Sequence, residues 1–119
     1  MKATIWSAFT MSAVFIPSTA ISADMFFDCR GVERKDGSAY ERNIRFELEF
    51  FRASHAYRKF SYRGGVRYKS AEGRYSSDNN EIIWGRDRDV IDRSSGQMIR
   101  EITRDGETYT QYMTCTRQD

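Results

Sequence analysis

The sequence predicts an all-β domain: an antiparallel up-and-down meander of about eight strands, closed as a small barrel or flattened sandwich and preceded by a signal-peptide helix. Three observations lead to this prediction. Apolar residues recur with a period of two, most clearly in Asn43–Phe51, where every second residue is apolar. Turn-forming residues recur about every 8–12 positions, which is typical of sandwiches and barrels. Two cysteines, Cys29 and Cys115, lie near the two ends of the domain.

Residues 1–23 have the features of a secretory signal peptide. Lys2 supplies a positive charge, and Ala3–Ile16 form an uncharged, mostly apolar run. This run is shorter than the roughly 20 residues that a membrane-spanning helix needs. Small residues follow, so we expect cleavage after Ala23, with Ala20 as the alternative. The sequence therefore predicts a bacterial protein that is periplasmic or secreted and has no membrane span after processing.

The remainder, residues 24–119, is expected to form a single β domain. A chain of this size has a thin core, and small exported domains often strengthen it with a disulfide. The two cysteines allow one pairing, Cys29 with Cys115, the alternative being two buried free thiols. In a closed meander the first and last strands are neighbours, so this disulfide would join them. Closing so long a loop stabilises a fold by about 4–5 kcal/mol in the chain-entropy model.

Turn signals divide the first half of the domain into five expected strands. Lys35–Ser38 separates the first two, and Arg63–Gly65 turns the third into the fourth. Ala71–Gly73 is interpreted as a further turn, after which a short fifth strand begins. The expected strands are Met25–Glu33, Tyr40–Arg52, Ala56–Tyr62, Val66–Lys69 and Arg74–Ser76.

The second half contains four expected strands. Ser94–Gly96 is one turn between them, and Asp105-Gly106 is the strongest hairpin signal in the chain, because its residues accept the positive φ angles of tight hairpins. The expected strands are Glu81–Gly85, Val90–Arg93, Gln97–Arg104 and Glu107–Thr116.

Positive charge is concentrated in the middle of the domain. Residues 52–75 hold seven Lys and Arg residues against one acid, Glu72, whereas the flanking segments are acidic. Within this part, Tyr57–Lys69 interleaves aromatic and basic residues. This pattern predicts either strands paired with acidic neighbours or a surface that binds an acidic protein or an anionic envelope surface. Nucleic acid is disfavoured as a partner because the protein is exported and nearly neutral.

Trp84 has two interpretations, because a tryptophan in a small barrel either fills the core or lies partly exposed at the mouth and contacts a ligand. The candidate ligand- or partner-binding residues are Tyr57, Arg58, Arg63, Arg67, Tyr68, Lys69 and Trp84.

Motifs for catalysis or cofactor binding are absent from the sequence. There is no nucleophile elbow, phosphate-binding loop or dinucleotide-binding fingerprint. The single histidine, His55, and the two cysteines do not make a zinc set. Asp87, Asp89 and Asp92 alternate with arginines, which favours ion pairs over a calcium loop. We therefore expect a protein that is not an enzyme and uses no cofactor or metal, with an envelope hydrolase as a remaining possibility.

Two stretches resemble known families. Val90–Met98, with the cysteine near the end, resembles an I-[DN]-R-x-[ST]-G pattern in small uncharacterised exported proteins of Gram-negative bacteria, and this resemblance implies no function. Gly64–Tyr68 is similar to part of the loop that C-type lysozyme inhibitors of the periplasmic and membrane-bound type insert into the lysozyme cleft. Arg63 stands where that loop has a serine.

The sequence thus predicts an exported non-enzymatic binding protein of unknown ligand that uses the basic aromatic surface of one hairpin. One alternative is a lysozyme-inhibitor-like protein, and another is a carrier of a small ligand inside the barrel. A filled barrel would leave only its outer face for function. An open pocket lined by Trp84 and tyrosines would favour the carrier.

Overall fold

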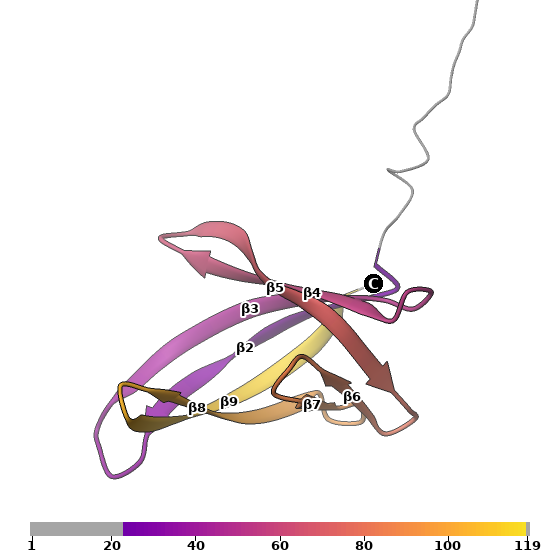
Figure 1. Ribbon diagram of the computed structural model, residues 1–119. Coiled ribbons are helices and arrows are strands. Elements are labelled where there is room, and N and C mark those ends of the chain that lie inside the picture. Colours follow the sequence, from indigo (N-terminus) through magenta and orange to yellow (C-terminus); the bar gives the residue numbers. More distant parts are fainter. Residues whose placement is uncertain (1–22, 119) are drawn as a thin grey trace, which may run out of the picture.

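The computed structural model describes residues 23–118, which form eight antiparallel strands in a nearly closed barrel (Figure 1). Residues 1–22, which are all but the last residue of the predicted signal peptide (residues 1–23), lie outside the described residues. No helix in the described part of the chain is long and apolar enough to cross a membrane. The strands are β2 (Met25–Lys35), β3 (Glu41–Phe51), β4 (Ala56–Arg63), β5 (Val66–Ser77), β6 (Glu81–Trp84), β7 (Asp89–Asp92), β8 (Gln97–Arg104) and β9 (Glu107–Gln118).

The sheet closes by pairing its first and last strands, as the sequence predicts. The strand order is β7-β6-β5-β4-β3-β2-β9-β8, so β2 lies between β3 and β9. The two edges of the sheet are therefore β7 and β8, which follow one another in the chain. This places the seam of the barrel between two consecutive strands, whereas the first and last strands, β2 and β9, are paired with each other.

Cys29 and Cys115 form the predicted disulfide. They are directly opposite one another in the β2–β9 ladder, and their Cα atoms are 3.9 Å apart. Both residues are buried, because the period-two alternation places them on the inward face. A disulfide is compatible with an oxidising compartment, where such bonds persist.

The fourth and fifth expected strands are one continuous strand, so the turn predicted at Ala71–Gly73 is wrong. β5 runs without interruption through this segment and pairs with β4 over most of its length. Gly73 serves packing instead of a turn, since a Cβ atom there would lie 3.0 Å from the ring atom Cε1 of Tyr57. The β4–β5 ladder shifts register next to Lys59, where Ser70 is the extra residue of a β-bulge.

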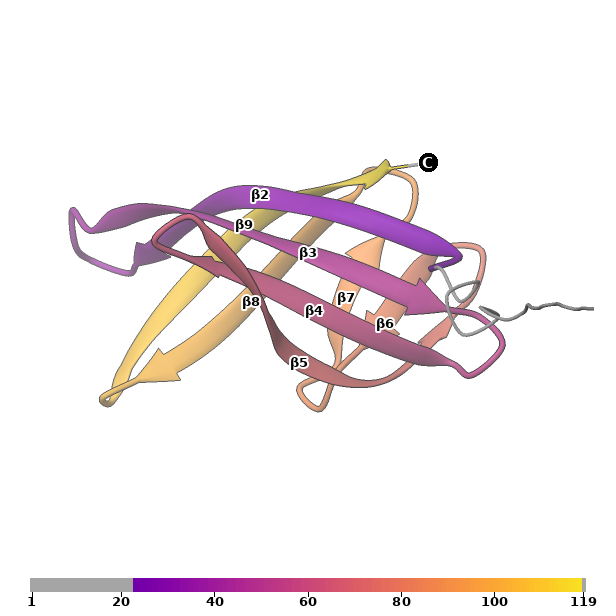
Figure 2. The ribbon, with the colours of Figure 1, turned by 90° about the horizontal axis from the view of Figure 1, so that it is seen from above.

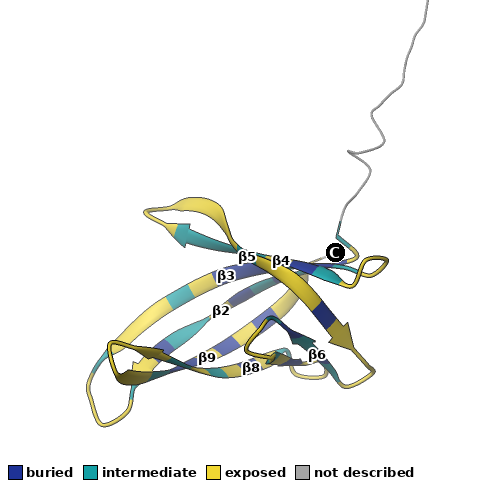
Figure 3. Ribbon diagram, viewed as in Figure 1, coloured by how far each residue is buried: buried dark blue, intermediate teal, exposed yellow. Residues whose placement is uncertain are grey.

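The apolar core occupies one end of the barrel. Around Phe50 the rings of Phe27 and Tyr75 pack edge-on, with centroids 5.9 and 4.9 Å away. The hairpins β2–β3, β4–β5 and β8–β9 all point to the opposite end (Figures 1 and 2). Their tips are exposed, while the buried segments lie toward the middle and the filled end (Figure 3). The buried core residues are Met25, Phe27, Cys29, Phe46, Leu48, Phe50, Tyr57, Tyr75, Ile82, Trp84, Ile91, Met98, Met113 and Cys115.

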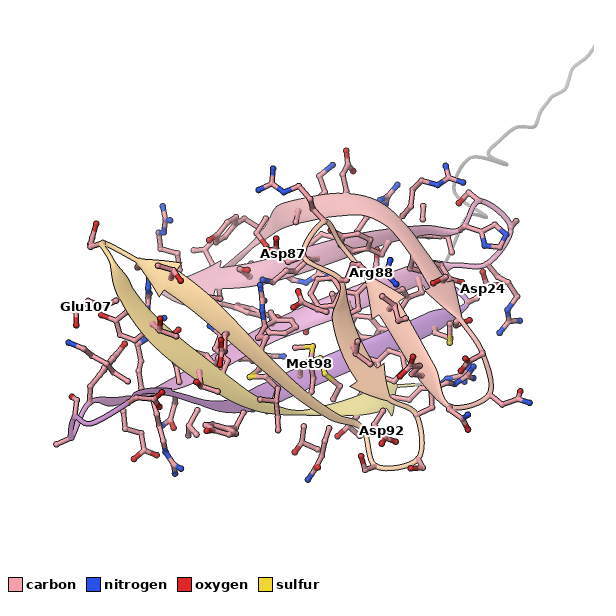
Figure 4. The ribbon with its side chains drawn as sticks, turned by 60° about the horizontal axis from the view of Figure 1, so that its bottom comes forward. Asp24, Asp87, Arg88, Asp92, Met98 and Glu107 are labelled. Carbon is pink, nitrogen blue, oxygen red and sulfur yellow. A yellow bond between two sulfur atoms is a disulfide. The ribbon has the colours of Figure 1, made fainter. Side chains whose placement is uncertain are left out.

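The turn between β7 and β8 ties the seam to the disulfide strand. The carboxylate of Asp92, at the end of β7 (Figure 4), accepts hydrogen bonds from the backbone N–H groups of Ser94 and Ser95 at 2.9 and 3.2 Å. Gly96 donates its N–H to the Asp92 carbonyl, and its own carbonyl accepts the N–H of Cys115, both at 2.7 Å. The Ser-Gly turn is therefore hydrogen-bonded to the residue that carries the disulfide.

Reduction of the disulfide is expected to lower the free energy of unfolding by about 4–5 kcal/mol, because the two cysteines are 86 residues apart and the unfolded chain gains freedom. Urea unfolding of the oxidised and reduced protein, with thiol content checked by mass spectrometry, measures this difference. Equal unfolding midpoints for the two forms would contradict the prediction.

Gly96→Ala and Gly106→Ala form a matched pair, because both glycines have nearly the same φ, +77° and +79°. An alanine at Gly106 meets no neighbour within 4 Å, whereas a Cβ at Gly96 would lie 2.5 Å from the Cys115 carbonyl oxygen. We expect Gly106→Ala to cost about 1 kcal/mol, from the backbone conformation alone. Gly96→Ala should cost about 3 kcal/mol, because the clash adds to it. Urea unfolding of both variants checks this, and equal losses would show that the close approach is unimportant.

Candidate ligand-binding site

The alternation along the β4–β5 hairpin divides the predicted binding residues between two faces of the sheet. On β4, Tyr57 is inward and Arg58 outward; on β5, Tyr68 is inward and Lys69 outward. Arg63 lies over the ring of Tyr68 at 5.5 Å, so it is on the inward side of the hairpin. The sequence-predicted set therefore does not form one surface. Its inward members are Tyr57, Arg63, Tyr68 and Trp84, and its outward members are Arg58, Arg67 and Lys69.

On the outer, convex face the basic residues are engaged by partners within the chain. Glu47 accepts hydrogen bonds from Arg45 at 2.9 Å, from Tyr62 at 2.9 Å and from Arg67 at 2.5 Å. The guanidinium of Arg67 also lies 3.7 Å from the ring centroid of Phe60. These contacts neutralise part of the positive charge of the hairpin, in line with the interpretation that its basic residues pair with acidic neighbours.

Two further outward residues have similar contacts. Lys69 makes an ion pair with Glu72 at 2.8 Å. Arg58 lies over the ring of Phe51 at 4.9 Å. Carboxylates therefore pair with two of the seven basic residues of segment 52–75, Arg67 and Lys69.

The inner, concave face contains a cavity of about 680 Å³ at the open end of the barrel, and we call it the mouth. Its volume lies within the range of small-molecule sites. Tyr68 stands at the outer lip and is 39% exposed. The concave residues that line the mouth include Ile44, Phe46, Lys59, Ser61, Tyr68 and Gln111.

A second, smaller cavity of about 330 Å³ lies beside the seam of the barrel and is bordered by the turn between β6 and β7, and we call it the seam cavity. Trp84 and Tyr57 line it and are almost fully buried, with ring centroids 5.3 Å apart. Trp84 therefore belongs to the core, but it also forms part of a cavity wall. Lys59 lines both cavities and connects them.

The seam cavity is lined by three cations, Lys59, Arg86 and Arg100, and by three carboxylates, Glu72, Asp87 and Asp89. Nε of Arg100 lies 3.4 Å from Oδ1 of Asp89, which is an ion pair across the seam between β8 and β7. Nζ of Lys59 lies 4.6 Å from the ring centroid of Phe46. Asp87, at the turn between β6 and β7 (Figure 4), lines the same cavity.

Two buried N–H groups, on residues that line this cavity, have no hydrogen-bond acceptor in the described part of the chain. They are Nε1 of Trp84 and Nε of Arg100, whose ion pair with Asp89 does not meet hydrogen-bond geometry. A buried donor without an acceptor costs free energy, so such groups in a folded protein require an explanation.

The ionisation of these side chains reflects their surroundings. Burial, with a smaller contribution from the charge of Arg100, lowers the pKa of Lys59 to about 8. Burial also raises the pKa of Asp89, although Arg100 and Lys59 act in the opposite direction. Lys59 is thus a cation that the fold holds in an unfavourable place, which is a property of many functional sites.

Comparisons with protein-family models, curated proteins and solved structures find no match for this chain. The resemblances to exported proteins with a Ser-Gly hairpin and to lysozyme inhibitors stay predictions. Within residues 23–118, no group of three or more His, Cys, Asp or Glu side chains is arranged to hold a metal ion.

Lys59, Asp89 and Arg100 are not among the binding residues predicted from the sequence. Lys59 lies two positions from Tyr57, and Arg100 two positions from Met98, so strand alternation places both cations on inward faces. A cation at an inward-facing position of an expected strand is the sequence feature that could have indicated these residues. Their meeting across the barrel depends on the seam position, which the sequence does not specify.

A buried carboxylate supports the floor of the open end. Glu33 is fully buried on β2 and accepts hydrogen bonds from Gln111 at 2.8 Å and Tyr40 at 2.9 Å. Arg42, at 3.3 Å, and Arg104 pair with the same carboxylate. Glu33 therefore joins strands β2, β3, β8 and β9 where the apolar core has ended.

These partners decide the pKa of Glu33. Burial alone would raise it, but the hydrogen bonds from Gln111, Tyr40 and Arg104 and the charge of Arg42 outweigh burial and lower the pKa to about 2. The folded state therefore favours the charged form over a wide pH range.

Glu33→Gln is expected to lower the free energy of unfolding by about 2–3 kcal/mol at pH 7. The wild-type advantage is fully present above the ordinary pKa of 4.5 and is lost as the pH falls toward about 2. Urea unfolding at pH 7, 4 and 2.5 measures the difference, with Glu41→Gln as control because Glu41 is exposed and pairs loosely with Arg34. A Glu33→Gln deficit that does not shrink at low pH would contradict this account.

Proposed function

We propose that this chain is an exported, non-enzymatic binding protein of the periplasm or cell exterior, and that it carries a small ligand in the mouth of its half-filled barrel. The observation that carries this proposal is the division of the interior: the barrel is filled by apolar side chains at one end and hollow at the other. A barrel built only for stability would fill both ends.

The open end is maintained by the strand arrangement. β5 pairs with β6 only through Tyr75–Ser77, so within the described chain its first part, from Val66 to Arg74, has a strand partner on one side only. The bulge at Ser70 bends the hairpin, and the hydroxyl of Ser70 lies 2.7 Å from that of Ser61. The hairpin tip therefore stands away from β8 (Figure 1).

The sequence predicts a binding surface on this hairpin without specifying its face, and we favour the concave face over the outer face. Arg67 and Lys69 already contact carboxylates of their own chain. Arg63 and Tyr68, which belong to the predicted set, remain at the lip of the mouth. The proposal thus retains the hairpin as a binding element but assigns the ligand to its inward side.

Filling the mouth should abolish uptake of a neutral amphipathic probe. We expect the fluorescent amine N-phenyl-1-naphthylamine to bind the wild type with one-to-one stoichiometry. Ser61→Trp should weaken binding at least about tenfold, because Ser61 lines the mouth and an indole at this position would fill part of the cavity. Fluorescence titration measures both. Ile99→Trp is the matched control, since Ile99 is 63% exposed on β8 and an added ring there leaves the mouth open. No binding to the wild type, or equal loss in both variants, would overturn the proposal.

A further inference from the structure

A row of apolar side chains crosses the outer, convex face of the sheet from β7 to β2. Ile99 on β8 is directly opposite Tyr112 on β9, and Tyr112 is directly opposite Val32 on β2. On the other side of the seam, Val90 lies at the level of Ile99, because the ion pair across the seam joins the inward neighbours of these two residues. We call the four residues Val32, Val90, Ile99 and Tyr112 the outer row.

The outer row is largely in contact with solvent. Ile99 is 63% exposed, Tyr112 42% and Val90 37%, whereas Val32 is half-buried. Three of the five large hydrophobic side chains that are exposed in the described part of the chain therefore belong to this one row. Exposed apolar side chains that are contiguous, and not scattered singly, mark interaction sites.

The charges beside the outer row differ between its two ends. At the β7 end, Asp92 is directly opposite Glu81 of β6, and neither carboxylate makes an ion pair within residues 23–118. Like charges in directly opposite positions destabilise a sheet. At the β2 end, Arg30 is exposed, and it shares the carboxylate of Asp28 with Arg45. One end of the row thus has negative charge without a cation beside it, and the other end has an exposed arginine.

These two charges lie on the same side of the row, toward the filled end of the barrel. Asp92 follows Val90 by two residues and leads into the turn that is hydrogen-bonded to Cys115. Arg30 precedes Val32 by two residues and is adjacent in sequence to the other cysteine of the disulfide. Since β7 is one strand beyond β8 and β2 is one strand beyond β9, both charges are equally far from the boundary between β8 and β9.

This arrangement makes the face complementary to itself. A second copy turned by half a turn about an axis parallel to the strands exchanges β8 with β9 and β7 with β2. Ile99 then faces the partner's Tyr112, and Asp92 faces the partner's Arg30. The same two contacts form again on the other side of the axis, as a two-fold symmetric interface requires.

We propose that the outer row is the interface of a symmetric homodimer. A second copy of this chain supplies both an apolar row and an arginine at the required distance from it. An anionic lipid surface fits less well, because it would meet the two carboxylates at the β7 end. The contact spans about four strands that are spaced about 4.8 Å apart, so it lies at the lower end of interface sizes, and we expect a dissociation constant of about 1–100 μM.

Sedimentation velocity of the oxidised protein, without its signal peptide, measures this equilibrium from low micromolar concentration to about 0.5 mM. The wild type should change from monomer to dimer over this range. Ile99→Glu should weaken the dimer at least about tenfold, because it places a charge in the centre of the apolar contact. Val66→Glu is the matched control, since Val66 is 66% exposed at the start of β5, outside the outer row, and it should leave the dimer unchanged.

A reciprocal change of charge tests the symmetry. Arg30→Asp places two carboxylates in each charge contact, and Asp92→Lys places two cations there, so each variant alone should dimerise at least about tenfold more weakly. An equimolar mixture of the two variants should recover the wild-type affinity, because both charge contacts of the mixed dimer are again between opposite charges.

The folding of each variant is checked by its melting temperature. Asp92→Lys also removes the hydrogen bonds that the carboxylate accepts from Ser94 and Ser95. If this variant does not fold, the comparison of Ile99→Glu with Val66→Glu decides alone.

The dimer is independent of the proposed carrier function, because the outer row and the mouth lie on opposite faces of the sheet. The neutral probe should therefore bind Ile99→Glu and the wild type equally. A wild type that stays monomeric up to about 0.5 mM would overturn the dimer. Equal loss in Ile99→Glu and Val66→Glu, or a mixture of folded charge variants that does not recover, would overturn it as well.

Discussion

The pairing of β2 with β9 is the constraint on which the rest of the barrel depends. The Cys29–Cys115 disulfide lies within this ladder, so the first and last strands are held together covalently. A sheet whose terminal strands are paired must have its seam elsewhere, and here the seam falls between β7 and β8. These strands are joined by a short turn that is bonded to Cys115 through Gly96. The filled end is therefore closed by the same residues that carry the disulfide.

The seam is closed over only part of its length because its two strands differ in length. β7 has four residues and β8 has eight, and the Asp89–Arg100 pair marks the point where β7 begins. Beyond Arg100, β8 runs toward the open end without β7 beside it. The edge of β5 is similarly unpaired there, and its Arg67 and Lys69 are the kind of charged side chains that discourage an exposed edge from pairing with another chain. The basic character of this segment thus has a structural reason that is independent of any ligand.

The all-β class, the closure of the meander and the disulfide follow from short-range features of the sequence: period-two alternation, turn residues and the positions of two cysteines. The error at Ala71–Gly73 has a different origin. Gly73 is a local turn signal, but in the fold its missing side chain leaves room for the ring of Tyr57 on the neighbouring strand. The candidate site depends on similar long-range information. Lys59, Asp89 and Arg100 belong to three separate strands, and their meeting follows from where the seam falls and from the bulge at Ser70.

The two ionic clusters of the interior illustrate opposite uses of buried charge. Glu33 is surrounded by Gln111, Tyr40 and two arginines, so its charge is satisfied and its pKa falls. Burial and, to a smaller extent, the like charge of Arg100 lower the pKa of Lys59, which for a lysine means that the folded state disfavours its charge. Leu48, which is opposite Lys59 in the β3–β4 ladder, is an apolar residue that is fully buried, and an apolar residue at position 59 would avoid the cost of a buried charge.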